Sequence, residues 1–217
     1  TAGTISGAAG SIITYTNLEV LLFQSTAAGD TINVLAPLAG TNHFVTGNGG
    51  GDTVTIGNQT ADFNTTFDGS LDNILGDILV TGEFNPAVSA VDILNVDYSG
   101  TVAPNIATIS VNPAFAFTLP APAPGGTDLG PATELAGFAP AVIRYRHGNS
   151  SFLFPGTNQM EFVNVLSGQG DDAISVLATT ASNTTTIDSR VGNDAIAVSG
   201  DNLSANNVFR GFDGNDQ

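Results

Sequence analysis

The stretch Gly170-Asp-Asp-Ala-Ile-Ser-Val176 recurs as Gly192-Asn-Asp-Ala-Ile-Ala-Val198 and begins again as Gly214-Asn-Asp216. Each copy places a glycine two residues before an aspartate, and in the first two copies the aspartate leads into an alternation ending in valine. The three aspartates recur with a 22-residue period, and the same period relates Asp30 to Asp52. A fixed period of this length is typical of solenoid and array architectures.

The alternation itself predicts β-strands. In Asp30-Thr-Ile-Asn-Val34, Asp52-Thr-Val-Thr-Ile56 and Asp92-Ile-Leu-Asn-Val96, successive side chains would point to opposite faces of a sheet. Helical periodicity is weak, and the best helix candidate is the short stretch Leu71-Asp-Asn-Ile-Leu-Gly76. We therefore predict an all-β fold, a right-handed parallel β-helix (β-solenoid) with about 22 residues per coil, each coil holding three short strands and three corners.

A longer repeat contains the shorter one. Residues 16–69 align without a gap on residues 158–211, so that Asp30 and Asp52 meet Asp172 and Asp194 in a 142-residue repeat. We predict one β-solenoid domain over 1–217, with repeat copy one at about 16–157 and a partial copy two at 158–217. We also expect the chain to be a piece of a longer repeat protein.

The middle of the chain departs from this pattern. Residues 112–140 hold six prolines and a Gly-Gly pair, and proline lacks the N–H that a central strand donates. We predict a long loop that leaves the solenoid body, serving either as an exposed spacer or as an arm that contacts another protomer.

Composition restricts the partners. Twenty acidic residues against four arginines and no lysine give a net charge of −16, which repels nucleic acid and anionic membrane surfaces and suits cations. Cysteine is absent, which excludes disulfides and cysteine metal sites. No apolar run is long enough for a membrane-spanning helix, so we expect no membrane insertion.

Some of the aspartate corners also match a metal-binding motif. Gly47-Asn-Gly-Gly-Gly-Asp52, Ser167-Gly-Gln-Gly-Asp-Asp172 and Gly211-Phe-Asp-Gly-Asn-Asp216 resemble the nonapeptide of hemolysin-type calcium-binding repeats, Gly-Gly-x-Gly-x-Asp-x-apolar-x. The resemblance implies Ca²⁺ ligation at these corners, and the candidate metal ligands are Asp52, Asp171, Asp172, Asp194, Asp213 and Asp216. That family repeats with the length of its nonapeptide, whereas this chain has the 22-residue period. The alternative is that aspartate caps each turn and stacks as a ladder.

The wider phrasing of the chain resembles very large repetitive bacterial extracellular proteins. The resemblance rests on Ile13-Thr-Tyr-Thr-Asn-Leu-Glu19, on the Asp30 and Asp52 phrases, and on Asp92-Ile-Leu-Asn-Val-Asp-Tyr-Ser-Gly100. It implies a secreted or surface-exposed β-solenoid in adhesion, matrix or cell envelope, and it names no ligand.

Two further sets of residues are candidate sites. Arg144 and Arg146 form the main cationic patch, which is either a solvated strand face or a binding site for an acidic neighbouring subunit or an anionic glycan. Glycosylation sequons, a weak signal in a chain rich in Asn and Thr, occur at Asn58, Asn64, Asn149, Asn183 and Asn202.

The favoured function is structural. We expect a module of an extracellular fibre, surface layer or biofilm matrix that is not an enzyme and assembles with itself end to end, with Thr4-Ile5-Ser6 of one copy covering the Asp216 corner of the next. A calcium-dependent adhesin or glycan-binding module, gripping glycans through residues 112–140, is the alternative. A β-helix carbohydrate-active enzyme is the third hypothesis, although the supply of basic groups is small.

Overall fold

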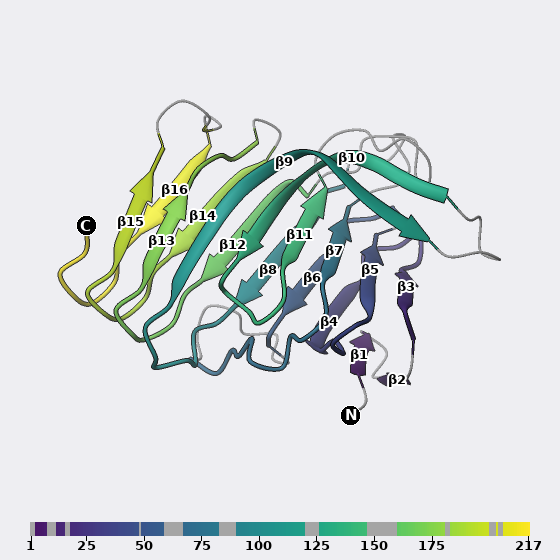
Figure 1. Cartoon of the computed structure of the whole chain (residues 1–217), viewed down its shortest axis with the longest axis horizontal. Helices are drawn as coiled ribbons and strands as arrows, with labels where there is room; N and C mark the ends of the chain where they lie inside the picture. Colours follow the sequence, from purple (N-terminus) through teal and green to yellow (C-terminus); the bar gives the residue numbers. More distant parts are fainter. Residues whose placement is uncertain are drawn as a thin grey trace.

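A computed structural model describes residues 3–7, 12–15, 18–47, 49–58, 67–82, 90–119, 126–146, 160–180, 183–199, 203 and 206–217. Every regular element among them is a β-strand, so the all-β prediction is confirmed. The strands form two eight-stranded sheets in which most neighbours are parallel (Figure 1). No described segment is a helix long and apolar enough to cross a membrane.

The first sheet, sheet A, carries eight strands. Their spatial order is β16 (Asn207–Arg210), β14 (Thr184–Asp188), β12 (Phe162–Leu166), β8 (Ile93–Asp97), β6 (Thr53–Ile56), β4 (Thr31–Ala36), β1 (Gly3–Gly7) and β2 (Ile12–Tyr15). Sheet B runs in the order β15 (Ala195–Val198), β13 (Ala173–Val176), β9 (Ile106–Leu119), β10 (Gly126–Ala136), β11 (Ile143–Arg146), β7 (Ile78–Thr81), β5 (Asn42–Thr46) and β3 (Val20–Gln24).

Consecutive strands alternate between the two sheets over β3–β8 and again over β12–β16. Val20 of β3 pairs with Asn42 of β5 in sheet B, and Thr31 of β4 pairs with Thr53 of β6 in sheet A. Each 22-residue step therefore holds two strands, and the prediction of three strands and three corners was wrong. The starts of these four strands are evenly spaced, two to a step, because one short strand plus one turn is enough to cross to the opposite sheet.

The 142-residue repeat relates strands of one sheet to strands of the other. The repeat places Thr31 of β4, in sheet A, on Ala173 of β13, in sheet B. It likewise places Asn42 of β5, in sheet B, on Thr184 of β14, in sheet A. The two repeat copies are therefore exchanged between the sheets, and similar corners stand at different edges of the molecule.

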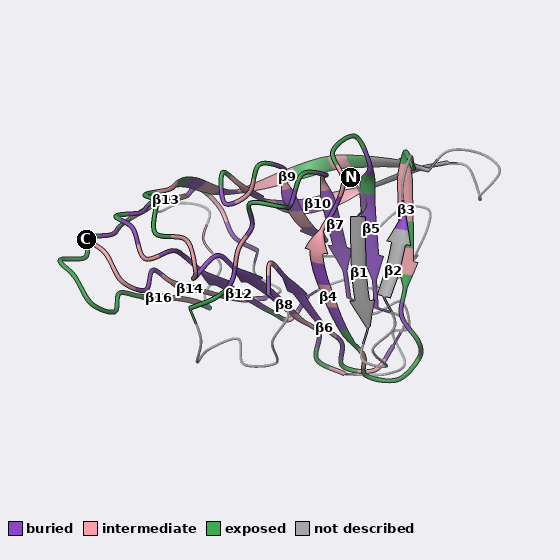
Figure 2. Ribbon diagram, turned by 90° about the horizontal axis from the view of Figure 1, so that it is seen from below, coloured by how far each residue is buried: buried purple, intermediate pink, exposed green. Residues whose placement is uncertain are grey.

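The core lies between the sheets and is built from columns of like residues. One column of sheet A contains Val34, Ile56, Val96, Val165 and Ile187, all without exposed surface, and the pairing register places them beside one another. Figure 2 shows this buried interior between the two layers, with exposed residues at the turns and toward the C-terminal end. Burial of aliphatic surface at roughly 25 cal/mol per Å² is the main term that stabilises such stacking.

The proline-rich segment 112–140 is not a loop over most of its length. It contributes the outer part of β9 and all of β10, which pair in antiparallel fashion (Figure 1). Pro113 and Pro131 lie where the register shifts between Gly130 and Ala132, a bulge at which missing N–H donors are tolerated. The loop prediction was wrong for 112–119 and 126–136, because Pro113 and Pro131 fall at this irregularity rather than in the regular ladder. Residues 120–125, with three of the six prolines, lie outside the described residues.

Two other local predictions fail. Residues 71–76 form turns rather than a helix, although Leu71 and Ile74 are fully buried in the core. The Thr4-Ile5-Ser6 stretch lies in β1, which pairs with β2 on one side and β4 on the other. Because both edges of β1 are bonded within its own chain, it cannot cover the Asp216 corner of another copy.

Candidate functional site

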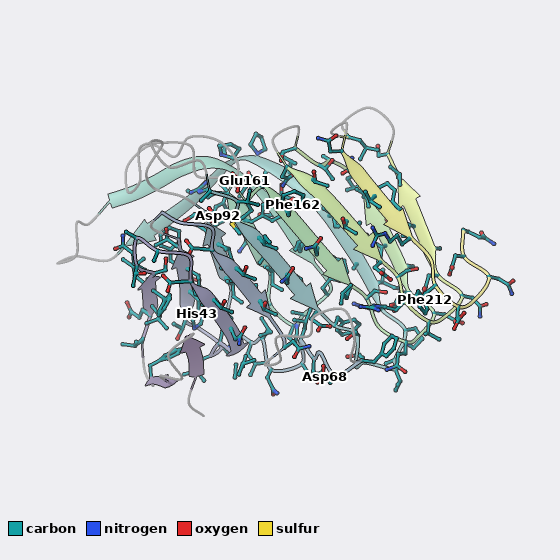
Figure 3. The ribbon with its side chains drawn as sticks, turned by 180° about the vertical axis from the view of Figure 1, so that it is seen from behind. His43, Asp68, Asp92, Glu161, Phe162 and Phe212 are labelled. Carbon is teal, nitrogen blue, oxygen red and sulfur yellow. The ribbon has the colours of Figure 1, made fainter. Side chains whose placement is uncertain are left out.

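The aspartates that precede the strands of sheet A form a column. The backbone N–H of Asp30 donates to Oδ1 of Asp52, and the N–H of Asp52 donates to Oδ1 of Asp92, both at 2.8 Å. The N–H of Asp92 donates to Oε2 of Glu161 at 2.7 Å, and Figure 3 shows these two residues close together. Each carboxylate thus caps the backbone of the neighbouring strand.

A second column precedes the strands of sheet B. The N–H of Asn105 donates to Oδ1 of Asp172 at 2.8 Å, and the N–H of Asp172 donates to Oδ1 of Asp194 at 2.8 Å. The N–H of Asp194 donates to Oδ1 of Asp216 at 3.2 Å. The 22-residue motif therefore brings Asp172, Asp194 and Asp216 together, while Asp52 stands in the other column.

These hydrogen bonds give the buried carboxylates a structural role. Asp52, Asp172 and Asp194 are 2% exposed or less, so their charge must be compensated inside the protein. Oδ2 of Asp172 also accepts the N–H of Gly168 at 3.0 Å, and both of its oxygens are then engaged by backbone amides. Charge-assisted bonds of this kind are shorter and stronger than neutral ones.

The same hydrogen bonds also involve the residues that were predicted to bind calcium. The predicted ligands are divided between the two columns, and their Oδ1 atoms are already held by N–H groups at Asp52, Asp172, Asp194 and Asp216. In the part of the chain that the structure describes, no group of three His, Cys, Asp or Glu side chains is arranged to hold a metal ion. Calcium binding therefore stays a prediction, and the ladder alternative has direct hydrogen-bond evidence.

Asp194 is buried between two other carboxylates of its column. Burial raises its pKa, and the negative charges of Asp172 and Asp216 act in the same direction. The N–H of Asp172 and the hydroxyl of Ser189 oppose the increase. Asp194 also lines a cleft of about 250 Å³ at the C-terminal end, together with Ile196 and Phe209.

The remaining two predicted ligands lie at exposed turns. Oδ1 of Asp171 accepts the backbone N–H of Asn193 at 2.8 Å and its side-chain Nδ2 at 3.2 Å, and Oδ1 of Asn193 accepts the N–H of Asn215 at 3.1 Å. Asp213 uses its backbone: its carbonyl accepts the N–H of Gly192 at 3.0 Å. Hydrogen bonds between successive turns therefore continue at the exposed corners, where the groups involved are accessible to solvent.

The glycines of the motif allow the corners to stack closely. Gly50 has a φ of 88°, and a Cβ there would lie 2.5 Å from the carbonyl carbon of Ala28 in the adjacent turn. Arg190 replaces a motif glycine and is the one described non-glycine residue with positive φ, at 63°. Its guanidinium lies 5.1 Å from the ring centre of Phe67 and next to Asp188, contacts that hold the side chain at this strained position.

Arg144 and Arg146 share one face of β11, as the sequence indicated, and their partners are internal. Arg144 forms ion pairs with Asp77 at 2.8 Å and with Glu134 at 3.0 Å. Arg146 has no exposed surface and donates to the carbonyls of Phe115 and Gly130.

Both guanidinium groups also lie over the Phe115 ring, at 4.8 Å for Arg144 and 5.3 Å for Arg146. Phe115 in turn packs on Phe44 and Leu79 of sheet B. The arginines therefore fasten the β9–β10 hairpin to sheet B. Recognition of an anionic glycan or an acidic subunit by this pair stays a prediction, and it would compete with these internal contacts.

Two of the five sequon asparagines lie in the described residues, and both are buried. Nδ2 of Asn58 donates to Oδ1 of Asp68 at 2.9 Å and to Oδ2 of Asp97, so a glycan on Nδ2 would break a buried network. Asn183 is 2% exposed. The sequons at Asn64, Asn149 and Asn202 lie outside the described residues.

Sequence reasoning missed a buried pair near the N-terminal end. His43 has no exposed surface; its Nδ1 donates to the carbonyl of Asp77 at 3.3 Å, which leaves Nε2 to accept the Tyr15 hydroxyl. Burial lowers the pKa of His43, while the Asp77 and Thr41 backbone bonds and the Asp77 charge oppose that shift. His43 gave no sequence signal, because its partners are 28 and 34 residues away.

Comparison with known proteins assigns the chain to no family. No family model, no curated protein and no solved structure matches the chain.

Proposed function

We propose that this chain is a structural module of an extracellular fibre, surface layer or biofilm matrix. In this proposal the alternating strands wind as a right-handed parallel β-solenoid with the 22-residue step as its coil, interrupted by the β9–β10–β11 segment. The observation that carries the proposal is the chemistry at the corners. Carboxylates, the residues most available for catalysis or ligand binding, are used to bond one coil to the next.

The rest of the molecule supports a scaffold. Like residues stack on like residues in the core, so the same interactions that join coils within the chain can join modules. The charge of −16 without lysine keeps dilute modules apart and favours solubility. Extracellular or cell-surface placement is part of the proposal and rests on the resemblance to giant repetitive bacterial proteins.

Electron microscopy of concentrated protein across a salt series tests the proposal. Because screening lengths fall from about 10 Å at 0.1 M salt to about 3 Å at 1 M, we expect fibres to appear as salt increases. Aligned fibres should diffract at about 4.8 Å, the spacing of neighbouring strands. Protein that stays monomeric at every salt concentration would contradict the assembly function.

A calcium-dependent adhesin is the second candidate, favoured by the exposed carboxylate of Asp216, which lines the C-terminal cleft with Asp194, and by that of Asp213 at the neighbouring exposed turn. Thermal melting in EDTA and in millimolar CaCl₂ separates the two candidates, since an ion that binds the folded state raises the melting temperature. An increase that Asp216→Asn and Asp213→Asn abolish would support the adhesin. Equal melting temperatures would remove calcium from the account. No observation favours the carbohydrate-active enzyme.

A further inference from the structure

The β9–β10 hairpin covers part of the outer face of sheet B. Ile78 of β7 belongs to the core between the sheets, whereas its neighbour Leu79 joins Phe44 of β5 in a second apolar cluster on the opposite face. Phe115 of β9 packs on this second cluster, and Figure 1 shows the hairpin extending past β11 and β7. The hairpin and the sheet therefore meet outside the main core.

A cavity of about 270 Å³ lies where the hairpin meets the sheet. Phe115 and Ala116 line it from the hairpin, and Leu79 lines it from the sheet. Its polar side chains come from three different segments, and they are Asn42, Asp77 and Arg144. An apolar wall with a few converging polar groups is the usual composition of a site that binds a small molecule.

Two of these polar groups are held in place by the protein itself. Asp77 directly precedes β7, and its Oδ1 accepts the N–H of Val142 at 3.0 Å while its Oδ2 accepts Nη1 of Arg144 at 2.8 Å. Nε of Arg144 donates to Glu134 at 3.0 Å. The carboxylate and the guanidinium are therefore oriented before a ligand arrives, which lowers the entropic cost of binding.

The same groups keep bonding capacity toward the cavity. The side chain of Asp77 is 42% exposed and that of Arg144 is 15% exposed, and Asn42 is an exposed residue at the start of β5. Within the described part of the chain, neither the Asn42 amide nor Nη2 of Arg144 has a hydrogen-bond partner. The cavity thus offers donors and acceptors side by side, an arrangement that suits hydroxyl groups, which both donate and accept.

The charges around the cavity compensate one another. Arg144 and Arg146, whose guanidinium groups both lie over the Phe115 ring, stand against the carboxylates of Asp77 and Glu134. Two positive and two negative groups leave no local excess of charge for an ionic ligand. The chain as a whole carries a net charge of −16, which repels anionic sugars. A neutral ligand rich in hydroxyl groups fits both conditions.

We propose that this cavity binds one neutral hexopyranose ring of a glycan. The hydroxyl groups of the sugar bond to Asp77, Asn42 and Arg144, and an apolar face of the ring lies against Phe115 and Ala116. The volume of about 270 Å³ is just below the range of about 300–1,000 Å³ for ligand pockets, so it admits one ring rather than a long chain. This inference goes beyond the structural role proposed above, does not depend on it, and requires no calcium.

Titrations followed by ¹H–¹⁵N NMR in the presence of EDTA test the site. The probes are the methyl glycosides of glucose, galactose, mannose and N-acetylglucosamine, with the methyl glycoside of glucuronic acid as the charged control. We expect at least one neutral glycoside to shift the amide signals of Asn42, Asp77, Ala116 and Arg144 until they saturate. The glucuronide should bind about tenfold more weakly than the best neutral probe because the protein is acidic.

Two results of the titration would contradict the proposal. Absence of saturable shifts with every neutral glycoside would overturn the site, and tighter binding of the glucuronide would overturn the neutral class of ligand. Fibre formation, measured on the same protein by electron microscopy, reports separately on the structural role, so either proposal can fail without the other.

A matched pair of asparagine variants locates the bound sugar. Asn42→Ala removes a bond to the ligand and should raise the dissociation constant about five- to tenfold, with no change in melting temperature because the residue is exposed. Asn73→Ala, at an exposed turn outside the cavity, should leave the dissociation constant unchanged. Ala116→Trp fills the cavity and should abolish binding. Equal affinities of the two asparagine variants would place the sugar elsewhere and overturn the assignment.

Discussion

Asp172 illustrates how a single side chain holds a corner. One of its oxygens accepts the N–H of Asn105, which lies just before the neighbouring strand β9, and the other accepts the N–H of Gly168 in its own turn. Its own N–H is accepted by Asp194 on the other side. A residue type that suits calcium therefore serves here as a backbone cap, and neutral glutamine or asparagine would supply fewer acceptors for the same donors.

Substitutions of Asp172 should lower the free energy of unfolding, and the loss should depend on how many acceptor oxygens the new side chain keeps. Asp172→Ala leaves the N–H groups of Asn105 and Gly168 without their acceptor, and each unsatisfied group costs about 1–3 kcal/mol, so we expect the free energy of unfolding to fall by about 2–6 kcal/mol. Asp172→Asn keeps one acceptor and should lose less. Urea unfolding measures both variants, and Asp213→Asn at an exposed turn is the control. Equal stability of Asp172→Ala and the parent would contradict the capping role.

His43 should make stability depend on pH. Its pKa is lowered in the folded state, so the unfolded chain binds a proton first, near its ordinary pKa of about 6.5. Stability is then full above that pH and falls as pH decreases toward the folded pKa, by at most about 1.4 kcal/mol per pH unit. When urea unfolding is measured between pH 7.5 and 5, the free energy of unfolding should decrease less steeply with falling pH in His43→Gln than in the parent protein. An unchanged slope would assign the effect to other groups.

At the scale of the element, the tight turns depend on glycine for two separable reasons. Gly40 and Gly50 both have positive φ, but a Cβ at Gly40 meets no atom within 4 Å, whereas at Gly50 it meets the backbone of the adjacent turn. Gly40→Ala should cost about 1 kcal/mol from φ alone, and Gly50→Ala should cost more. Thermal melting of the pair tests this. Equal losses would mean that neighbouring turns separate easily.

The β9–β10 hairpin shows where element prediction failed. Proline content indicated a loop, yet Pro113 and Pro131 are placed at a bulge and the rest of each strand keeps its ladder. Phe44, on which Phe115 of the hairpin packs, comes from β5, far away in the chain, and Arg146 reaches back from the next strand, β11, to the carbonyl of Phe115. Local composition contains no information about such contacts.

At the scale of the whole molecule, we expect that one complete 22-residue step can be deleted without loss of the fold. Deletion of residues 173–194 removes β13 and β14 together and leaves Asp172 ahead of Ala195, with Asp216 available to accept its N–H. We expect a folded protein with a lower melting temperature. Deletion of 173–193 shifts the following strand by one residue and turns its core side chains outward, so it should lose more stability. Circular dichroism melting compares the two deletions.

The spacing of the Asp phrase determined the all-β class, the 22-residue step and the pairing of like residues, because stacked strands require one period throughout. The sequence also placed Asp172, Asp194 and Asp216 in succession. A further signal lies in the even spacing of Val20, Thr31, Asn42 and Thr53, which divides each step in half and indicates two strands per step.

Only the tertiary structure decided what those residues contact. Whether a carboxylate faces an ion or the N–H of the next strand depends on the lateral register of two strands, and that register is set by packing across the core. The position of the proline-rich hairpin, the burial of Arg146 and the equal strand counts of the two sheets likewise arise from contacts between distant segments. The periodicity of the sequence predicts where the strands are, and the packing of the two sheets determines which strands become neighbours.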